Sequence, residues 1–184
     1  MEARKSIANG GTTMIVSEFT ATGINLDDYA DRLQNLGPAL DKVGVYVEGL
    51  AKQAIVRGTS IGGKPLAPLA ASTKANKQRL GKGRGILRSD GQLLASITSV
   101  RTRATEVQVG TNLEYAPWVI LGTPPYSIKP KKAPALRFYT ASGWRTAQQV
   151  NHPGLPERDI FEGWQQKAGP FIQATLAAYL SGDT

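Results

Sequence analysis

The chain has 184 residues, of which 41% are hydrophobic, and this suits one folded domain and excludes a wholly disordered chain. It contains no cysteine, which excludes disulfides, thiolate nucleophiles and cysteine-ligated metal sites. No apolar run reaches the ~18–20 residues of a bilayer span, and no secretory signal is recognisable, so we expect no membrane association. We expect a single domain over 1–184 with a flexible N-terminus at about 1–11.

The formal net charge of +8 is unevenly distributed along the chain. Residues 1–50 carry a net charge of −3 and residues 74–103 one of +7, while residues 129–145 add five bases and no acid. This asymmetry predicts an anionic partner or an acidic surface on a neighbouring subunit, and a solvated basic loop is the alternative. The candidate interface or DNA-facing residues are Lys74, Lys77, Arg79, Lys82, Arg84, Arg88, Lys129, Lys131 and Lys132.

The first half of the chain combines a strand, a long helix and a loop. Residues 12–20 are rich in β-formers and predict a short strand. From Leu26 to Ala54 apolar residues recur at steps of three or four, which predicts an amphipathic helix of about 30 residues that Gly37-Pro38 either kinks or restarts. The glycines and prolines of residues 58–85 predict a long loop or arm, with a helical turn near 72–80.

The second half alternates short strands and helices. We expect a short capped helix at 89–97, a β-hairpin made of 97–103 and 106–110, an apolar turn or short helix at 115–122, and a strand at 135–140. A last helix is predicted to begin at Pro170, with Phe171, Leu176, Tyr179 and Leu180 facing inward. These elements indicate an α+β fold in which a long N-terminal amphipathic helix and a C-terminal helix pack on a small antiparallel sheet.

The only histidine, His152, lies in the stretch VNHPGLPERDIF. A hydrolase would need a nucleophile beside this base, and a zinc site would need further ligands, but no G-x-S-x-G elbow or ligand cluster accompanies it. Pro153 favours an extended His152, and Gly154 permits a positive φ. We therefore interpret His152, Pro153, Gly154 and Arg158 as a structural turn, and we expect no catalytic residue, metal or cofactor.

Several segments in fixed order carry a resemblance to a known family. They are GKPLAPLAASTKANK, ILRSDGQLLASI and VQVGTNLEYAPWVILGT, followed by IKPKKAPALRF and VNHPGLPERDIF. Over about residues 45–180 the chain resembles the phage virion morphogenesis (tail completion) family. The resemblance implies a small α+β protein without catalysis, acting at the phage neck or tail end.

The same resemblance implies an assembly role. Its expected partners are other copies of the chain in a ring (a hexamer matches a tail tube), neighbouring neck, tail terminator or tail tube proteins, and DNA passing through the lumen. The expected location is the virion neck or tail end, after assembly in the host cytoplasm. Ring closure needs two different patches, and the acidic first helix and the basic 74–103 segment are the candidates.

Two other classes of function remain open from the residues. The basic segments, with Trp118, Tyr126, Phe138 and Trp144 as stacking groups, would also suit a nucleic-acid-binding module, although no recognised nucleic-acid fold motif is present. An enzyme of the phage life cycle, such as a wall hydrolase, is the third hypothesis, and it would require His152 as its base.

Overall fold

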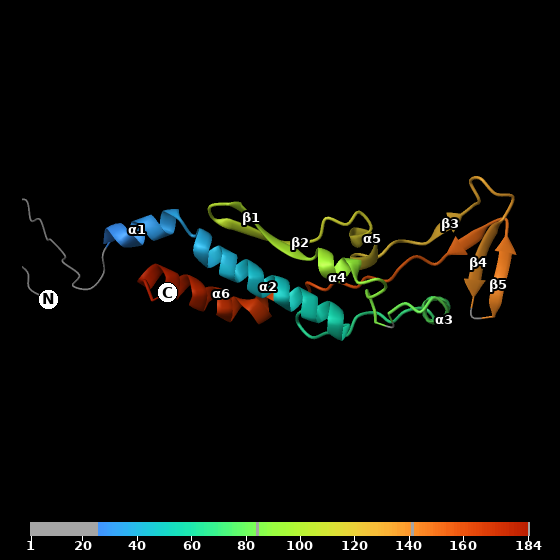
Figure 1. Cartoon of the computed structure of the whole chain (residues 1–184), viewed down its shortest axis with the longest axis horizontal. Helices are drawn as coiled ribbons and strands as arrows, with labels where there is room; N and C mark the ends of the chain where they lie inside the picture. Colours follow the sequence, from blue (N-terminus) through green and yellow to red (C-terminus); the bar gives the residue numbers. More distant parts are fainter. Residues whose placement is uncertain (1–25, 84, 141, 184) are drawn as a thin grey trace, which may run out of the picture.

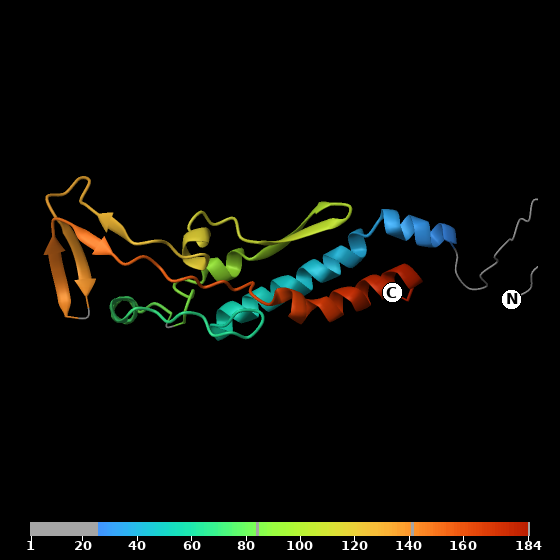
Figure 2. The same ribbon diagram turned by 180° about the vertical axis from the view of Figure 1, so that it is seen from behind.

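A computed structural model describes residues 26–83, 85–140 and 142–183. Over these residues the molecule is elongated, with helices towards one end and a β-hairpin at the other (Figures 1 and 2). The expected strand at 12–20, the N-terminus at 1–11 and Arg84 lie outside the described residues. The predicted α+β class is confirmed, while several element boundaries differ from expectation.

The predicted N-terminal helix is two helices, α1 (Leu26–Gln34) and α2 (Gly37–Arg57). Pro38 lies in the first turn of α2, where an N–H would have no intrahelical partner, so the Gly37-Pro38 pair restarts the helix. α1 is fastened to the last helix of the chain. Arg32 donates a hydrogen bond to the Tyr179 carbonyl (3.0 Å), and the Tyr179 hydroxyl donates one to the Asn35 carbonyl (2.6 Å).

The C-terminal helix α6 (Trp164–Ser181) begins before Pro170, so the prediction that Pro170 occupies its first position is wrong. Pro170 inside the helix cannot donate to the carbonyl four residues earlier. Packing offsets this defect, because α6 runs antiparallel beside α2 (Figure 1) and the Phe171 ring stacks on Tyr46 with centroids 3.9 Å apart. Phe171, Leu176, Tyr179 and Leu180 are partly buried, and Ala168 is fully buried.

The predicted hairpin is present as β1 (Thr98–Arg103) and β2 (Glu106–Gly110), and it packs on α2. Glu48 of α2 fastens it, since its carboxylate accepts hydrogen bonds from the Lys52 ammonium (2.7 Å), the Ser99 N–H (2.8 Å) and the Ser99 hydroxyl (2.9 Å). The hydrogen bond from Lys52, followed by those from Ser99, lowers the pKa of Glu48, although its burial opposes this shift.

The two predicted short helices are α4 (Gln92–Ser96) and α5 (Ala116–Ile120). We expected a capped helix at 89–97, but α4 begins only at Gln92, and the chain enters it through Gly91 in a left-handed conformation (φ +80°) without a side-chain cap. Together with α2 and the segment before α6, these helices enclose the main core. Its largest fully buried side chains are Ile55, Ile97 and Ile160.

The described strands form three separate two-stranded antiparallel sheets in place of the single small sheet that we expected. Besides β1–β2, these are β3 (Tyr126–Ile128) with β6 (Val150–His152), and β4 (Leu136–Thr140) with β5 (Gly143–Ala147). The strand predicted at 135–140 is therefore confirmed as β4. The β4–β5 hairpin stands at the far end of the molecule, joined to the core by the two extended segments that carry β3 and β6 (Figure 1).

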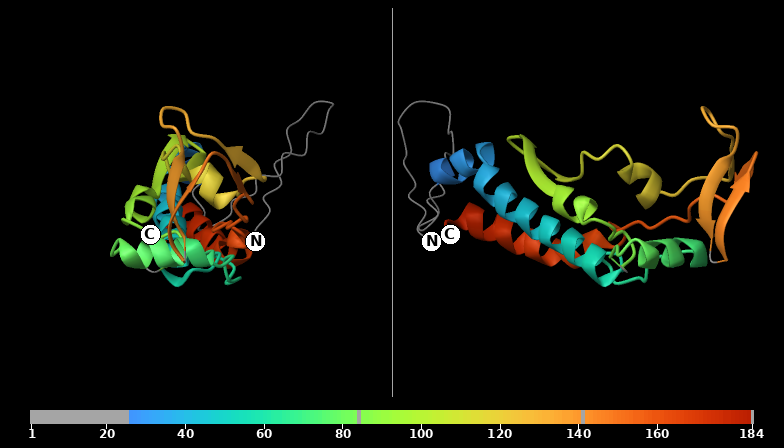
Figure 3. Two further views of the ribbon diagram at one scale, coloured as in Figure 1. Left: turned by 90° about the vertical axis from the view of Figure 1, so that its right-hand side faces the viewer. Right: turned by 45° about the vertical axis from the view of Figure 1, so that its right-hand side comes forward.

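The arm at residues 58–85 contains α3 (Ala71–Arg79), which confirms the helical turn expected near 72–80. None of the residues of α3 is buried in the described part of the chain. Figure 3 shows that the arm carries α3 away from the core to lie beside β4. The arm and the β4–β5 hairpin thus form one end of the molecule, opposite α1.

Candidate functional site

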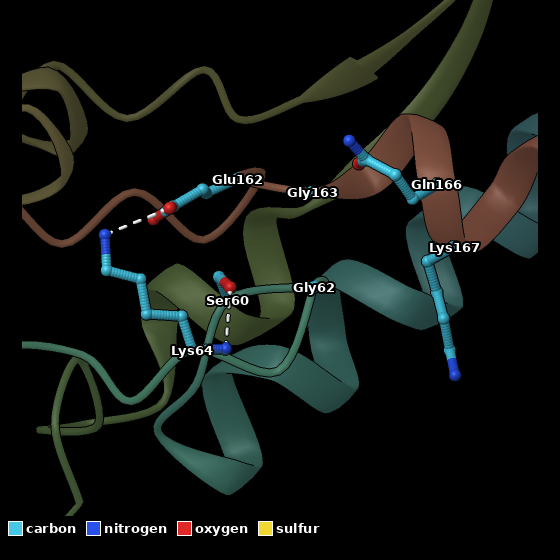
Figure 4. Close-up of a pocket in the computed structure, with 7 residues that line it drawn as sticks. All are labelled: Ser60, Gly62, Lys64, Glu162, Gly163, Gln166 and Lys167. Carbon is cyan, nitrogen blue, oxygen red and sulfur yellow. Dashed lines mark hydrogen bonds and ion pairs between the residues drawn. The ribbon is translucent and has the colours of Figure 1, made fainter.

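The base of the arm is bound firmly to the segment that precedes α6. The Ile61 and Gly62 N–H groups donate to the carbonyls of Ile160 (2.8 Å) and Glu162 (2.9 Å). The Lys64 ammonium lies 3.0 Å from the Glu162 carboxylate, which raises the pKa of Lys64 (Figure 4). Gly62 also approaches Gly163 so closely that a Cβ on Gly163 would lie 2.8 Å from the Gly62 Cα.

Groups that line the hollow at this junction bind one another. Figure 4 shows Lys64 and Glu162 directed at each other, while Lys167 points away from that pair. The Ser60 hydroxyl accepts a hydrogen bond from the backbone N–H of Lys64 at 3.1 Å. The junction therefore serves as an attachment of the arm.

Arg158, which the sequence assigned to a structural turn, lies under the next part of the arm. Its side chain is 5% exposed and donates hydrogen bonds to the carbonyls of Ala67 (2.8 Å) and Pro68 (3.1 Å). Burial lowers the pKa of the guanidinium. The backbone N–H of Arg158 donates a hydrogen bond to the Ile120 carbonyl at 2.7 Å. Arg158 thus joins three segments: the arm, the end of α5 and its own turn.

His152 ends β6 and makes the contacts of a turn residue. Its Nδ1 accepts a hydrogen bond from the Gly154 N–H at 3.0 Å, and its ring stacks on Tyr126 with centroids 4.9 Å apart. Gly154 has a φ of +86°, and a Cβ there would collide with the Thr123 carbonyl. Between these two residues, Pro153 is exposed. One ring nitrogen of His152 is thus engaged by the turn itself.

Three of the nine predicted basic residues hold the arm in shape. The Lys77 ammonium donates to the carbonyls of Gly85 (2.9 Å) and Arg88 (2.6 Å), and burial lowers the pKa of Lys77. Lys82 pairs with Asp90 at 3.0 Å. The Arg79 guanidinium lies over the Tyr139 ring, 4.9 Å from its centroid, and this contact joins α3 to β4.

The other described members of the set are exposed, and all but Arg88, which lies beside α4 and α5, belong to the end of the molecule that carries α3 and the β4–β5 hairpin. These are Lys74, Arg88, Lys129, Lys131 and Lys132. The segment 74–103 is divided, because Arg101 and Arg103 lie on β1, paired with Asp41 and Glu106, both at 3.5 Å. The basic surface therefore consists of the arm and residues 129–145, without β1.

The sequence offered Trp144 only as a stacking group and Arg137 only as one of the bases of residues 129–145, and it did not predict that the two contact each other and organise this surface. Trp144 lies on β5, with the Arg137 and Arg79 guanidiniums 4.7 Å and 5.2 Å from its ring centroid. Tyr139 meets the same ring edge-on at 5.5 Å. The Ser142-Gly143 pair that follows the predicted strand at 135–140 is a turn signal, which could have indicated β5 and placed Trp144 beside β4.

The described residues also bear on metal binding and on membranes. Within them, no three histidine, cysteine, aspartate or glutamate side chains gather closely enough to hold a metal ion. No helix among them has both the length and the apolar character to cross a bilayer.

Comparisons with known proteins bear on the whole chain. The family model described as "Phage virion morphogenesis family" matches residues 18–180. The search of curated proteins and the search of solved structures gave no match. The match covers most of the 184 residues and includes α1, the arm, the His152 turn and α6. The resemblance noted in the sequence is thereby confirmed: the chain belongs to the phage virion morphogenesis family.

Proposed function

We propose that this chain is a structural virion protein of the neck or tail completion type, needed to complete tails and to join them to heads. The family match over residues 18–180 is the observation that carries this proposal. The contacts of His152 support a non-enzymatic role, because Tyr126 and Gly154 are the groups that engage it. The protein would assemble in the host cytoplasm and reside at the neck or tail end of the virion.

Assembly into a ring, with six copies as the match to a tail tube, is supported by surfaces that a monomer leaves uncovered. An apolar hollow lies between α2, β2 and α6, lined by Val43, Val47, Val107, Val109, Phe161, Trp164 and Ile172. Trp118 and Leu121, at α5, are 61% and 66% exposed. Such apolar surface is typical of proteins that bind other proteins.

The three small sheets support the same proposal. A two-stranded sheet is marginally stable in water by itself, and β4–β5 contacts little besides α3. Neighbouring copies, or adjoining neck, tail terminator or tail tube proteins, would supply the missing contacts. α1 and the basic surface lie at opposite ends of the molecule (Figure 1), so any contact between them would join two different molecules, as a heterologous interface requires.

Deletion of the gene from a phage that encodes this chain tests the proposal. Electron microscopy of the lysate should show heads and tails that remain separate, and the wild-type chain supplied in trans should restore joined particles. Normal virions without the chain would refute the proposal.

The variant His152→Asn separates the structural role from the enzymatic alternative. The asparagine side chain can still accept the Gly154 N–H, as in an Asx-turn, but it cannot act as a base near neutral pH. His152→Asn should therefore restore joined particles as well as the wild type does. A folded but inactive His152→Asn protein would favour the enzyme.

A further inference from the structure

The basic end of the molecule is the feature with the largest unbalanced charge. We define the basic end as residues 70–91 and 124–149, which carry α3 and the β4–β5 hairpin. It contains eleven lysines and arginines and a single acid, Asp90. Asp90 is already paired with Lys82. We infer that the basic end binds the phosphate backbone of double-stranded DNA without regard to sequence.

The two segments form one surface because aromatic and guanidinium groups join them. Arg79 of α3 lies over both Tyr139 and Trp144, and Arg137 covers Trp144 from its own hairpin. These contacts place the arm beside β4 and β5 (Figure 3). Arg79 meets the turn end of the β4–β5 hairpin, and the lysines of residues 129–132 precede the other end of the same hairpin (Figure 1), so both groups belong to the far part of the molecule, while Arg88 lies nearer the core beside α4 and α5.

The size of the positive charge favours DNA over an acidic protein surface as the partner of the basic end. The rest of the chain holds eleven bases and thirteen acids, a net charge of −2. The acidic helix α1 of a neighbour has a net charge of −2, from Asp27, Asp28 and Asp31 against Arg32. Docking of α1 would thus leave most of the net charge of +10 at the basic end unneutralised. Duplex DNA offers one negative charge per ~1.7 Å, which matches such an excess.

The contacts that the aromatic rings already make favour binding to duplex DNA over binding to single-stranded DNA. Binding to single strands relies on exposed rings on which bases stack. Here Tyr126 and Trp144 are 48% and 53% exposed, but Tyr126 already stacks on His152, and the Trp144 ring already has the Arg79 and Arg137 guanidiniums against it. The exposed lysines of residues 129–132 are the groups best suited to contact phosphates.

Fluorescence anisotropy with a labelled ~30-base-pair duplex of random sequence tests this inference on the full chain, between 50 and 200 mM salt. The test variant is Lys131→Glu with Lys132→Glu. The matched control is Lys42→Glu with Lys167→Glu, which makes the same change in net charge at exposed positions on α2 and α6. A single strand of equal length is the comparison ligand.

We expect the wild type to bind the duplex at 50 mM salt and to lose affinity steeply by 200 mM. The test variant should bind at least ~10-fold more weakly, with a log–log salt slope smaller by about 2, whereas the control should change affinity less than ~3-fold. Absence of duplex binding at 50 mM salt, equal losses in the two variants, or tighter binding of the single strand would each overturn the inference. So would loss of self-association in the test variant with unchanged DNA binding. The assay needs no ring, so its failure would leave the proposed function to its own test.

Discussion

Arg158 holds the start of the arm through two hydrogen bonds to the backbone carbonyls of Ala67 and Pro68. The sequence marked it as part of a turn after His152, but its partners lie about ninety residues earlier in the chain. No local pattern reveals such a contact, because it depends on how the arm and the turn pack. A buried guanidinium needs acceptors for its N–H groups, and these carbonyls supply them.

Replacing Arg158 should therefore loosen the arm and destabilise the protein. Arg158→Met leaves the two carbonyls without their donor, and we expect the free energy of unfolding to fall by about 1–3 kcal/mol. Urea denaturation measures this change. The control is Arg145→Met on exposed β5, which should alter stability by less than about 0.5 kcal/mol. Equal effects of the two substitutions would contradict the assigned role.

Glu48 makes part of the stability depend on pH. Its pKa in the folded protein is lowered from 4.5, chiefly by the hydrogen bond from Lys52. The ionised carboxylate therefore contributes stability above its unfolded-state pKa, and this contribution is lost as the pH falls through the lower folded-state value. Glu48→Gln should destabilise the protein by about 1–2 kcal/mol at pH 7.

Urea denaturation between pH 7 and pH 3 measures the difference between wild type and Glu48→Gln. This difference should shrink once the pH passes below the unfolded-state value. Glu114→Gln, at an exposed position, should cause little change at either pH. A difference that stays constant over this range would show that the ionised carboxylate is not what fastens β1.

At the scale of elements, the local sequence pattern predicted the helices and strands whose formation depends on neighbouring residues. The periodicity of α2, the alternation in β1 and β2 and the turn signals around α3 all indicated the right element. The start of α6 was misplaced because the turns before Pro170 are held by packing, with Ala168 buried against Val43 and Val47. The division into three sheets was missed because β3 and β6 pair over more than twenty intervening residues.

The attachment of the arm to α6 gives a test at this scale. Gly163 has a φ of +77° and little room for a Cβ, so Gly163→Ala should lower stability by about 2–4 kcal/mol. Gly49 lies inside α2 with no atom within 4 Å of its would-be Cβ. Gly49→Ala should therefore raise stability by about 0.5–1 kcal/mol. Thermal and urea unfolding measure both, and a neutral Gly163→Ala would contradict the close approach.

At the scale of the whole molecule, the elongated shape separates two kinds of surface. The helical part carries the apolar hollow beside β2, which suits contact with other proteins. The opposite end carries the unbalanced positive charge and the projecting hairpin. The sequence predicted the charge asymmetry, but the grouping of residues 74–90 with 129–145 depends on the contact of Arg79 with Trp144.

The most direct test of the central claim is to locate the chain in mature particles. Cryo-electron microscopy of purified virions, with an antibody bound to a tag at the C-terminus beside α1, gives that location (Figure 1). The proposed function predicts label arranged as a six-fold ring at the tail end or neck. Purified, infectious virions that contain none of the chain would contradict it.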